Sequence, residues 1–327
     1  MMNIFRNKIV LVTGGTGSFG QKFTEIVLKK YGPKKLIIFS RDEMKQYEMR
    51  KKFNQKNIRY FIGDVRDADR LHRAFYGVDI IIHAAALKIV PAAEYNPFEV
   101  VKTNVIGAEN VINVAIDNKV KMVMALSTDK AANPVNLYGA TKLCAEKMFV
   151  AANNYSPYAT KFSVVRYGNV LGSRGSVIPF FKECALKKVI PITDVRMTRF
   201  WITLEEGVNF VIKCMTEMKG GEVFTPKIPS MKIVDLAKAV CPNVKFKIIG
   251  IRAGEKLHET MVTSDEGRYA VEKKDMFVIY PDVSFGFGAT KKMSGKALPE
   301  SFEGYRSDTN DKWLSIPELR ELISKHG

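Results

Sequence analysis

Short apolar runs alternate with amphipathic stretches over the first half of the chain. Runs such as 9–12 (IVLV) and 36–39 (LIIF) are apolar on both faces, which is typical of strands buried in a parallel sheet. Between them, apolar residues recur at helical spacing, as at Phe23, Ile26 and Val27. The predicted strands are residues 9–12, 36–39, 58–63, 78–83, 121–127 and 161–166. The predicted helices are residues 20–30, 41–54, 68–75, 97–119, 138–153 and 317–325.

Strands and helices that alternate at this spacing predict an α/β fold built on a doubly wound parallel (Rossmann) sheet. After about residue 169 the alternation loosens, the elements shorten and turn signals become frequent. We therefore expect a Rossmann domain over residues 1–169 and a smaller α/β substrate lobe over residues 170–327. The two are expected to be interleaved, with part of the second region returning to the sheet. The segment from Ser284 to Tyr305 is expected to be mainly loop.

The composition narrows the class of protein. Hydrophobic residues make up 46% of the 327 residues, and 51 lysines and arginines against 34 acidic residues give a net charge of +17. A basic excess suits nucleic acid, a membrane surface, anionic small substrates or simply a solvated lysine-rich surface. No nucleic-acid motif is present and no apolar stretch approaches the ~18 residues of a membrane span. The widely spaced cysteines suit reduced thiols in a cytoplasmic protein. These cysteines are Cys144, Cys184, Cys214 and Cys241.

A glycine-rich turn follows the first predicted strand. Residues 14–20 read GGTGSFG, with Gly14, Gly17 and Gly20 at three-residue spacing. Such a turn lets the backbone approach a pyrophosphate, and the helix that follows presents free N–H groups and a partial positive charge. The strand before it and the helix after it are the context that a dinucleotide-binding motif requires. The alternative is a glycine turn that binds no ligand.

The end of the second predicted strand bears on the choice between NAD and NADP. An acidic residue there would bind the ribose 2′-hydroxyl, but this chain has Ser40, Arg41 and then Asp42. Because a guanidinium holds a phosphate with two parallel hydrogen bonds, we expect NADP. Arg41 could instead be a solvated residue at a helix start. Asp64 and Val65 are expected near the adenine, although Asp64 also suits a helix N-cap.

A Tyr-x-x-x-Lys pair follows the fifth predicted strand. Tyr138 and Lys142 are four residues apart, so on a helix they share a face. A tyrosine has a pKa near 10 in water, and a neighbouring ammonium together with a bound nicotinamide would lower that pKa and make the phenol a base. Asp129 and Lys130 lie at the end of the same strand, where ligands gather in open α/β sheets. Their plain alternative is a structural ion pair.

These residues resemble the extended short-chain dehydrogenase/reductase superfamily over nearly the whole chain. The finer resemblance is to the soluble inverting UDP-N-acetylglucosamine 4,6-dehydratases that open pseudaminic acid biosynthesis for flagellin glycosylation. Large membrane-bound relatives commonly have methionine at the position of Tyr138. The motifs that carry the resemblance are GGTGSFG (14–20), FSRDE (39–43), GDVRD (63–67), HAAALK (83–88), STDKAANPVNLYGATKL (127–143), VVRYGNVLGSRGSV (164–177), ITDVRMTRFWIT (192–203) and IGIRAGEKLHE (249–259).

The resemblance implies an NADP-dependent lyase that removes water across C5–C6 of the sugar. Oxidation at C4 makes the C5 proton acidic, with Tyr138 taking the C4 hydroxyl proton, NADP the hydride, and Thr128 and Lys142 beside them. Lys130 as a neutral amine then removes the C5 proton, and Asp129 as an acid protonates the leaving C6 hydroxyl. The hydride returns to C6 and C5 is inverted. The expected product is UDP-2-acetamido-2,6-dideoxy-β-L-arabino-hexos-4-ulose.

The resemblance also implies which residues hold the two ligands. Asn169 and the arginines are expected at the UDP phosphates and Glu255 at the uridine ribose, with a solvated surface charge as the alternative for each arginine. The residues expected to bind the cofactor are Gly14, Thr16, Gly17, Ser18, Phe19, Gly20, Ser40, Arg41, Asp42, Lys45, Asp64, Val65, Ala84, Ala86, Tyr138 and Lys142. Those expected to bind UDP-N-acetylglucosamine are Lys88, Asn169, Arg174, Val177, Thr193, Arg199, Arg252 and Glu255.

Other functions remain open at this stage. A nucleotide-sugar epimerase or a retaining dehydratase would use the same scaffold, and a non-catalytic NADP-binding module is a third interpretation. We expect a homo-oligomer, with a hexamer as one candidate. We expect no metal site, because no carboxylate or cysteine stands at ligand spacing from His83 or His258.

Overall fold

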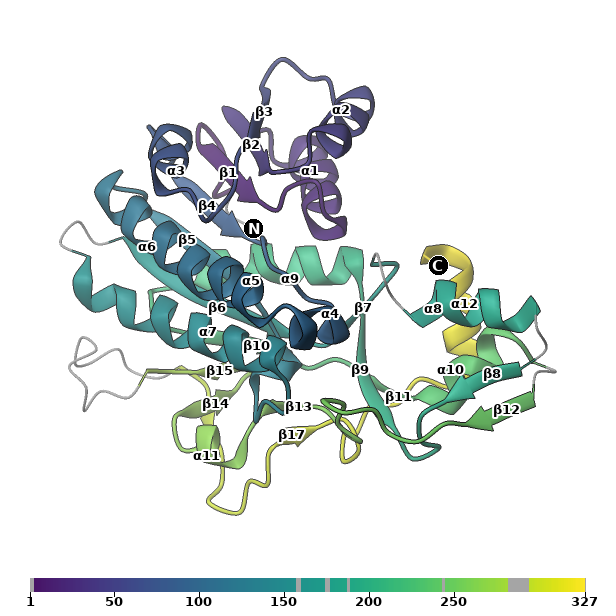
Figure 1. Ribbon diagram of the computed structural model, residues 1–327. Helices are drawn as coiled ribbons and strands as arrows, with labels where there is room; N and C mark the ends of the chain where they lie inside the picture. Colours follow the sequence, from purple (N-terminus) through teal and green to yellow (C-terminus); the bar gives the residue numbers. More distant parts are fainter. Residues whose placement is uncertain are drawn as a thin grey trace.

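A computed structural model describes residues 3–156, 160–173, 177–186, 189–242, 245–281 and 294–326. In these residues one sheet of ten strands runs through the molecule (Figure 1). In order across the sheet the strands are β16 (Lys296–Ala297), β14 (Ala270–Glu272), β15 (Met276–Ile279), β10 (Val223–Pro226), β6 (Lys161–Tyr167), β5 (Met122–Thr128), β4 (Ile80–His83), β1 (Ile9–Thr13), β2 (Lys35–Ser40) and β3 (Ile58–Ile62).

The strands from β3 to β10 pair in parallel, whereas β15, β14 and β16 extend the sheet in antiparallel fashion. This is the doubly wound sheet that the apolar runs predicted. Because β10 comes after residue 169, the later part of the chain does return to the sheet, as expected. Parallel pairing brings the carboxyl ends of β1, β2, β4, β5 and β6 to one edge, where the candidate site lies.

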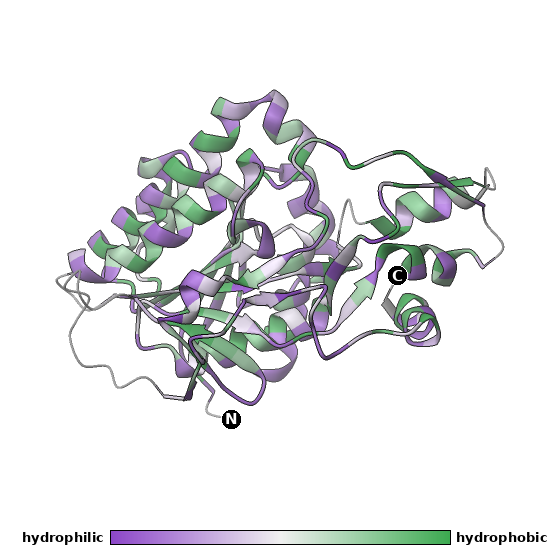
Figure 2. Ribbon diagram, turned by 90° about the horizontal axis from the view of Figure 1, so that it is seen from below, coloured by the Kyte–Doolittle hydropathy of each residue, from purple (hydrophilic) through white to green (hydrophobic). Residues whose placement is uncertain are grey.

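Helices cover both faces of the sheet, as strands apolar on both faces require. Val10 and Val12 of β1 pack toward α1 and α9, while Leu11 packs toward α3, α6 and α7. The helices carry hydrophobic and hydrophilic residues in turn along their length (Figure 2). The helices of this part are α1 (Ser18–Lys30), α2 (Glu43–Lys52), α3 (Ala68–Phe75), α4 (Val90–Tyr95), α5 (Pro97–Val101), α6 (Gly107–Asp117), α7 (Leu137–Tyr155) and α9 (Leu204–Glu217).

The single helix expected over residues 97–119 is interrupted. Between α5 and α6 the chain forms a π-helical turn, η1 (Lys102–Ile106), and Asn104 within it is buried. Asn104 accepts a hydrogen bond from the Leu87 N–H at 2.9 Å and donates to the Leu87 carbonyl at 2.9 Å. The π-helical turn thus coincides with the hydrogen bonds between Asn104 and Leu87 of a distant loop. The hydrophobic periodicity of residues 97–119 carries no information about that loop.

The remaining elements form a smaller lobe beside the sheet. Its core is a cluster that includes Ile178, Ile190, Trp201, Leu236 and Leu319. The elements beyond the main sheet and its helices are β7 (Asn169–Leu171), α8 (Val177–Leu186), β8 (Val189–Ile192), β9 (Thr198–Thr203), β11 (Ser230–Lys232), α10 (Ile233–Val240), β12 (Lys245–Ile248), β13 (Thr260–Val262), α11 (Ser264–Gly267), β17 (Tyr305–Arg306) and α12 (Ile316–His326). In Figure 1 most of them lie to one side of the sheet.

Two predictions concern the later part of the chain, and one of them falls in part outside the described residues. The helix predicted over residues 317–325 is present as α12. The segment from Ser284 to Tyr305 lies in part outside the described residues; its described part contains β16 and the start of β17. Among the helices that the structure describes, none has the length and apolar character needed to span a bilayer.

Candidate active site

A cavity of about 930 Å³ opens at the carboxyl ends of the parallel strands, between the sheet and the smaller lobe. Every predicted site residue among the described residues lines it, except Gly20. Gly20 lies within α1, where a Cβ would come 2.3 Å from the Gly15 carbonyl oxygen. It therefore permits helix–loop packing and does not face the cavity. Arg174 lies outside the described residues.

One end of the cavity is formed by the glycine-rich turn and the start of α1. Gly14 has φ 63°, a conformation that glycine adopts without strain. The Thr16 hydroxyl donates to the Ser40 hydroxyl at 3.0 Å, which joins this turn to the end of β2. Gly17 is the N-cap of α1, so the free N–H groups of the helix begin at the cavity wall.

The charged groups after β2 divide between structural contacts and the cavity. Asp42 caps α2 by accepting from the Lys45 N–H at 2.9 Å, and it also pairs with the Lys45 ammonium. Asp64 accepts three hydrogen bonds from Arg66, one from its backbone N–H and two from its guanidinium, and another from Arg41 at 3.3 Å. The half-exposed Arg41 guanidinium is paired with Asp64 and lines this end of the cavity together with Lys45.

The acid–amine pair lies on the short 3-10 turn η2 (Asp129–Ala131) that ends β5. The Asp129 Oδ1 atom accepts from the Thr128 hydroxyl at 3.0 Å and from the Lys130 ammonium at 3.1 Å. The Asp129 side chain is 1% exposed and that of Lys130 is 23% exposed, so only the amine reaches toward solvent. Burial raises the pKa of Asp129, although the neighbouring Lys130 charge opposes that change.

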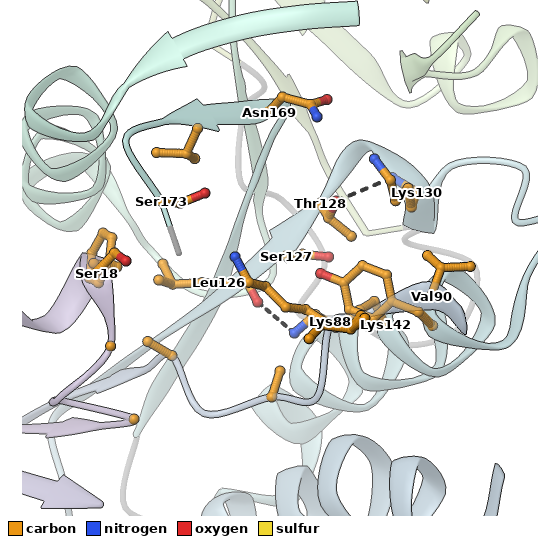
Figure 3. Close-up of a pocket in the computed structure, with 18 of the residues that line it drawn as sticks. Ser18, Lys88, Val90, Leu126, Ser127, Thr128, Lys130, Lys142, Asn169 and Ser173 are labelled. Carbon is orange, nitrogen blue, oxygen red and sulfur yellow. Dashed lines mark hydrogen bonds between the residues drawn. The ribbon is translucent and has the colours of Figure 1, made fainter. Parts of the chain in front are cut away.

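Tyr138 and Lys142 lie one turn apart on α7, on its buried face. The Lys142 ammonium donates to the Leu126 carbonyl at 2.7 Å (Figure 3). Burial lowers the pKa of Lys142 to about 8. Figure 3 places Lys142 and Lys130 on one side of the cavity, with Ser18 of the glycine-rich turn at the far end. The Tyr-x-x-x-Lys pair and the acid–amine pair thus line the same cavity.

Two protonation expectations differ from this arrangement. Burial raises the pKa of Tyr138 to about 12, and the main opposing charge is Lys130, not Lys142 as expected. Burial alone would lower the pKa of Lys130, but the charges of Asp129 and Glu259 raise it, which favours the ammonium over the neutral amine in the ligand-free cavity. The physical reason in both cases is that the site is buried and its charged side chains interact with one another. A bound cofactor or substrate would add further charges to this set.

Glu259 is the main feature that sequence analysis missed. Its buried carboxylate lies 3.2 Å from the Lys130 ammonium and 3.6 Å from Arg199 Nε. Glu259 stands just before β13, more than a hundred residues after Lys130, and its approach depends on tertiary folding. The motif at residues 249–259 ends on this residue, which was the available signal, but nothing in the local pattern separates it from a surface glutamate.

The described residues that the sequence assigned to the sugar nucleotide also line the cavity, and Figure 3 places Lys88 close to Lys142. Arg252 is about half exposed and lies 3.8 Å from Glu255. Partial burial and the charge of Lys130 lower the pKa of Lys88. Arg199 also lines the cavity, but its terminal nitrogens donate to the carbonyls of Thr198, Lys256 and Leu257. The guanidinium is therefore largely committed to the protein, which leaves little of it for the phosphate predicted from the sequence.

Buried polar atoms without hydrogen-bond partners gather around this cavity. Among the described residues, nine such side-chain atoms occur, and six belong to residues of the cavity wall. A buried polar group without a partner is destabilising, so these atoms indicate a polar ligand. The six atoms are Thr103 Oγ1, Ser127 Oγ, Asp129 Oδ2, Asn169 Oδ1, Trp201 Nε1 and Glu255 Oε2.

Aromatic residues of the wall were also missed. Tyr167 at the end of β6 and Trp201 of β9 line the cavity, and burial raises the pKa of Tyr167. Single aromatic residues within apolar strands look like core residues in a sequence. No group of three or more His, Cys, Asp or Glu side chains that could hold a metal ion occurs in the part of the chain that the structure describes.

The chain matches a family model over most of its length, and it matches named relatives over nearly all of it. Residues 10–281 match the family model described as polysaccharide biosynthesis protein. The chain is 55% identical to a Campylobacter jejuni protein named UDP-N-acetylglucosamine 4,6-dehydratase (inverting), with 98% of each chain covered. It is 41% identical to a protein of Rickettsia conorii named UDP-glucose 4-epimerase, over 98% of this chain and 96% of the other.

A solved structure agrees with these sequence matches. The protein Pen from Bacillus thuringiensis is 40% identical, and the two structures superpose with a TM-score of 0.89 over 98% of both chains. A family match over most of the chain, together with relatives of this identity and coverage, shows the family directly. This chain belongs to the polysaccharide biosynthesis protein family, within the extended short-chain dehydrogenase/reductase superfamily.

Proposed function

We propose that this protein is an inverting UDP-N-acetylglucosamine 4,6-dehydratase. The observation that carries the proposal is the Asp129–Lys130 pair, held 3.1 Å apart at the wall of a cavity that Tyr138 also lines. Redox chemistry at C4 alone needs no additional acid–amine pair, whereas elimination of water needs both an acid and a base. The relative from Campylobacter jejuni carries the name of this activity.

NADP is the cofactor that the site fits best. The glycine-rich turn and the N-terminus of α1 suit a pyrophosphate, and Arg41 at the end of β2 suits a 2′-phosphate. The unpartnered Ser127 and Asn169 oxygens lie at the wall of the same cavity. When bound, the nicotinamide would accept a hydride from sugar C4 and return it at C6. Gly14, Thr16, Ser18, Phe19, Ala84 and Ala86 would enclose the rest of the dinucleotide.

The side chains of this protein would divide the proton transfers. Tyr138 would take the C4 hydroxyl proton, helped by the positive charges of Lys142 and of the bound nicotinamide. Once C4 is a ketone, the C5 proton is acidic enough for an amine base. Lys130 would remove that proton, and Asp129 would protonate the leaving C6 hydroxyl. Return of a proton to C5 from the opposite face would invert that centre.

The charged state of Lys130 is compatible with this scheme. Transfer of one proton from the Lys130 ammonium to Asp129, across 3.1 Å, yields a neutral amine and a neutral acid together. In a dehydrated site a neutral pair gains relative to an ion pair, because burial disfavours both charges. A substrate that excludes the remaining water would thus favour the protonation states that elimination needs.

The test is product identification in deuterated water. Purified protein, UDP-N-acetylglucosamine and NADP should give a 4-keto product with deuterium at C5 and the β-L-arabino configuration by NMR. Tyr138→Phe, which removes only the hydroxyl, should lower turnover at least about a hundredfold. Failure to form a 4-keto product, or a product without deuterium at C5, would refute the proposal.

The second candidate is a nucleotide-sugar 4-epimerase, which the Rickettsia conorii relative favours by its name. An epimerase conserves the mass of the substrate, whereas a dehydratase product is lighter by one water. A retaining dehydratase gives the same mass with the original C5 configuration. Mass spectrometry and the NMR couplings at C5 therefore separate all three activities in one sample.

Cofactor choice can be tested separately through Arg41. We expect the protein to bind NADP more tightly than NAD, and Arg41→Ala to weaken NADP binding by about tenfold or more with NAD nearly unaffected. Isothermal titration calorimetry measures both constants. Arg59→Ala is a matched control. Arg59 lies on β3, and its guanidinium donates to the backbone carbonyls of Lys56 and Ile58. Equal losses for the two cofactors in Arg41→Ala would contradict the assignment.

The wider setting follows from this activity. The expected product suits the first step of pseudaminic acid synthesis for flagellin glycosylation, in the cytoplasm. We also propose a homo-oligomer, supported by the exposed aromatic side chains of Tyr95 on α4 and Phe98 on α5. The division into a domain over residues 1–169 and an interleaved lobe over residues 170–327 remains a prediction of the same kind.

A further inference from the structure

We propose that Glu259 is a positioning residue of the acid–amine pair. Glu259 contacts the Lys130 ammonium, as Asp129 does, and bears a negative charge that Arg199 and Lys256 stabilise, so that Asp129 is the carboxylate that takes up a proton. This inference rests on the proposed function, since it explains how Asp129 becomes an acid. It concerns a residue outside the cavity wall that would act only through its neighbours.

The geometry places Lys130 between two carboxylates. The Lys130 ammonium lies 3.1 Å from Asp129 Oδ1 and 3.2 Å from Glu259 Oε1. Both carboxylates are almost fully buried, at 1% and 2% exposure. Among the described residues, Lys130 is the one cation paired with Asp129, whereas Glu259 also pairs with Arg199 and Lys256. Asp129 is therefore the carboxylate that gains more by taking a proton.

The surroundings of Glu259 favour the charged form of that residue. Arg199 Nε lies 3.6 Å from Glu259 Oε1, and the Lys256 ammonium lies 3.9 Å from Oε2. The Glu259 N–H donates to the Ser307 hydroxyl at 2.9 Å, which fixes the backbone. Burial alone would raise the pKa of Glu259, but the charges of Lys130, Arg199 and Lys256 lower it.

Asp129 has fewer cationic partners than Glu259, although each carboxylate has one buried oxygen, Asp129 Oδ2 and Glu259 Oε2, without a hydrogen-bond partner among the described residues. The Asp129 Oδ1 atom accepts from Thr128 and Lys130. Burial and the neighbouring Glu259 charge both raise the pKa of Asp129. A carboxyl oxygen without a partner at the cavity wall is where a protonated acid could donate to a leaving hydroxyl.

The other charged and titratable groups around the pair come from separate elements. Lys88 and Tyr138 of α7 lie close enough to Lys130 for its charge to act on their pKa values. Arg199 of β9 and Lys256 of the loop before β13 face Glu259. Among the described residues, the groups that face Asp129 and Lys130 therefore include Glu259, Arg199, Lys256, Lys88 and Tyr138.

Two variants isolate the charge of Glu259. Glu259→Gln keeps the size of the side chain and removes its charge, whereas Glu259→Asp keeps the charge and withdraws it by one methylene. Glu300→Gln is the matched control, because Glu300 is exposed and lies outside the site. Circular dichroism and thermal unfolding establish that each variant is folded.

The first measurement needs neither substrate nor cofactor. Carbon-13 NMR of protein labelled at the aspartate carboxyl carbons, with Asp129 assigned from Asp129→Asn, follows the titration of Asp129 directly. We expect the Asp129 pKa to fall by about one unit or more in Glu259→Gln, because a nearby negative charge is lost. The Asp129 pKa should fall by less in Glu259→Asp, which keeps the charge but withdraws it by one methylene, and should stay at the wild-type value in Glu300→Gln. An unchanged Asp129 pKa in Glu259→Gln would overturn the proposal.

The second measurement is the pH profile of turnover with UDP-N-acetylglucosamine and NADP. In Glu259→Gln the acid form of Asp129 is lost at lower pH, so the alkaline limb should shift to lower pH and kcat at pH 7.5 should fall about 10- to 100-fold. KM should stay within about twofold. Glu259→Asp should recover most of the loss. A fall in kcat with an unmoved profile would show a merely structural role and overturn the proposal.

The outcomes also separate this inference from the proposed function. If the wild-type protein forms no 4-keto product, the dehydratase assignment fails, yet the ligand-free titration still decides whether Glu259 controls Asp129. If Glu259→Gln does not fold, the titration of Glu259→Asp decides. Withdrawal of the charge should then move the Asp129 pKa measurably downward, and no movement would refute the inference.

Discussion

Gly139 shows how closely a single residue can constrain this site. It directly follows Tyr138, and a Cβ at this position would lie 2.2 Å from the Lys130 carbonyl oxygen. Absence of a side chain therefore lets the first turn of α7 touch the backbone of η2. This contact brings the residue that would accept the C4 proton next to the residue that would accept the C5 proton.

Gly139→Ala should consequently separate Tyr138 from Lys130 without removing either. The obstacle is a backbone atom, which cannot rotate aside, so we expect turnover to fall by about a hundredfold. Stability should fall by about 1–3 kcal/mol. Gly207→Ala is the control, since Gly207 lies within α9 and a Cβ there would meet open space. The Gly207→Ala protein should be slightly more stable than the wild type, because alanine favours a helix more than glycine does. Turnover near the wild-type rate in Gly139→Ala would contradict this view.

At the scale of elements, the local sequence pattern predicted the helices and strands but not their interruptions. The apolar runs ended where the strands of the sheet end, to within a few residues, because strand burial is encoded locally. The π-helical turn of η1 was not visible, since it depends on Asn104 meeting Leu87 across the fold. Arg41 and Lys130 line the cavity, and local motifs at strand ends pointed to both. Glu259 contacts Lys130 only because the chain folds a distant segment against η2, which no local pattern shows.

Asn104 should couple helix geometry to substrate binding. It bonds both backbone groups of Leu87 and donates to the Thr141 hydroxyl at 3.1 Å, and Leu87 precedes Lys88 at the cavity. Asn104→Ala should cost about 1–3 kcal/mol of stability and raise KM for the sugar nucleotide several-fold, with a smaller change in kcat. Chemical denaturation and steady-state kinetics measure these effects.

Asn153 provides the matched control for that experiment. It makes comparable backbone hydrogen bonds, to Phe149, Val150 and Phe162, but lies away from the cavity. Asn153→Ala should therefore lose similar stability and keep the wild-type KM. An equal rise of KM in the two variants would show that general loosening, and not the Leu87 loop, controls substrate binding.

At the scale of the whole molecule, a buried charge cluster joins the parallel sheet to the later chain. Arg166 of β6 is 1% exposed and pairs with Glu146 of α7 at 2.6 Å and Glu266 of α11 at 2.9 Å. It also donates to the Met261 carbonyl at 2.7 Å. Glu146 lies two turns after Tyr138 on the same helix, so this cluster fixes α7 against the segment that carries Glu259.

Removal of the guanidinium leaves two carboxylates in the interior without their cation. Arg166→Met should therefore cost about 3–5 kcal/mol of unfolding free energy at pH 7. Arg306→Met, which breaks a partly exposed pair with Asp308, should cost at most about 1 kcal/mol. Urea denaturation followed by circular dichroism measures both.

The pH dependence of that loss has a definite sign. Burial would raise the pKa of Glu266, but Arg166 lowers it below the ordinary value. The stabilisation is therefore present above the ordinary glutamate pKa and disappears as the pH falls through the lowered one. In Arg166→Met the unpaired carboxylates would instead take up protons readily, so the difference between variant and wild type should shrink from pH 7 to pH 4. A difference that is constant over this range would mean that lost packing, and not charge pairing, explains the effect.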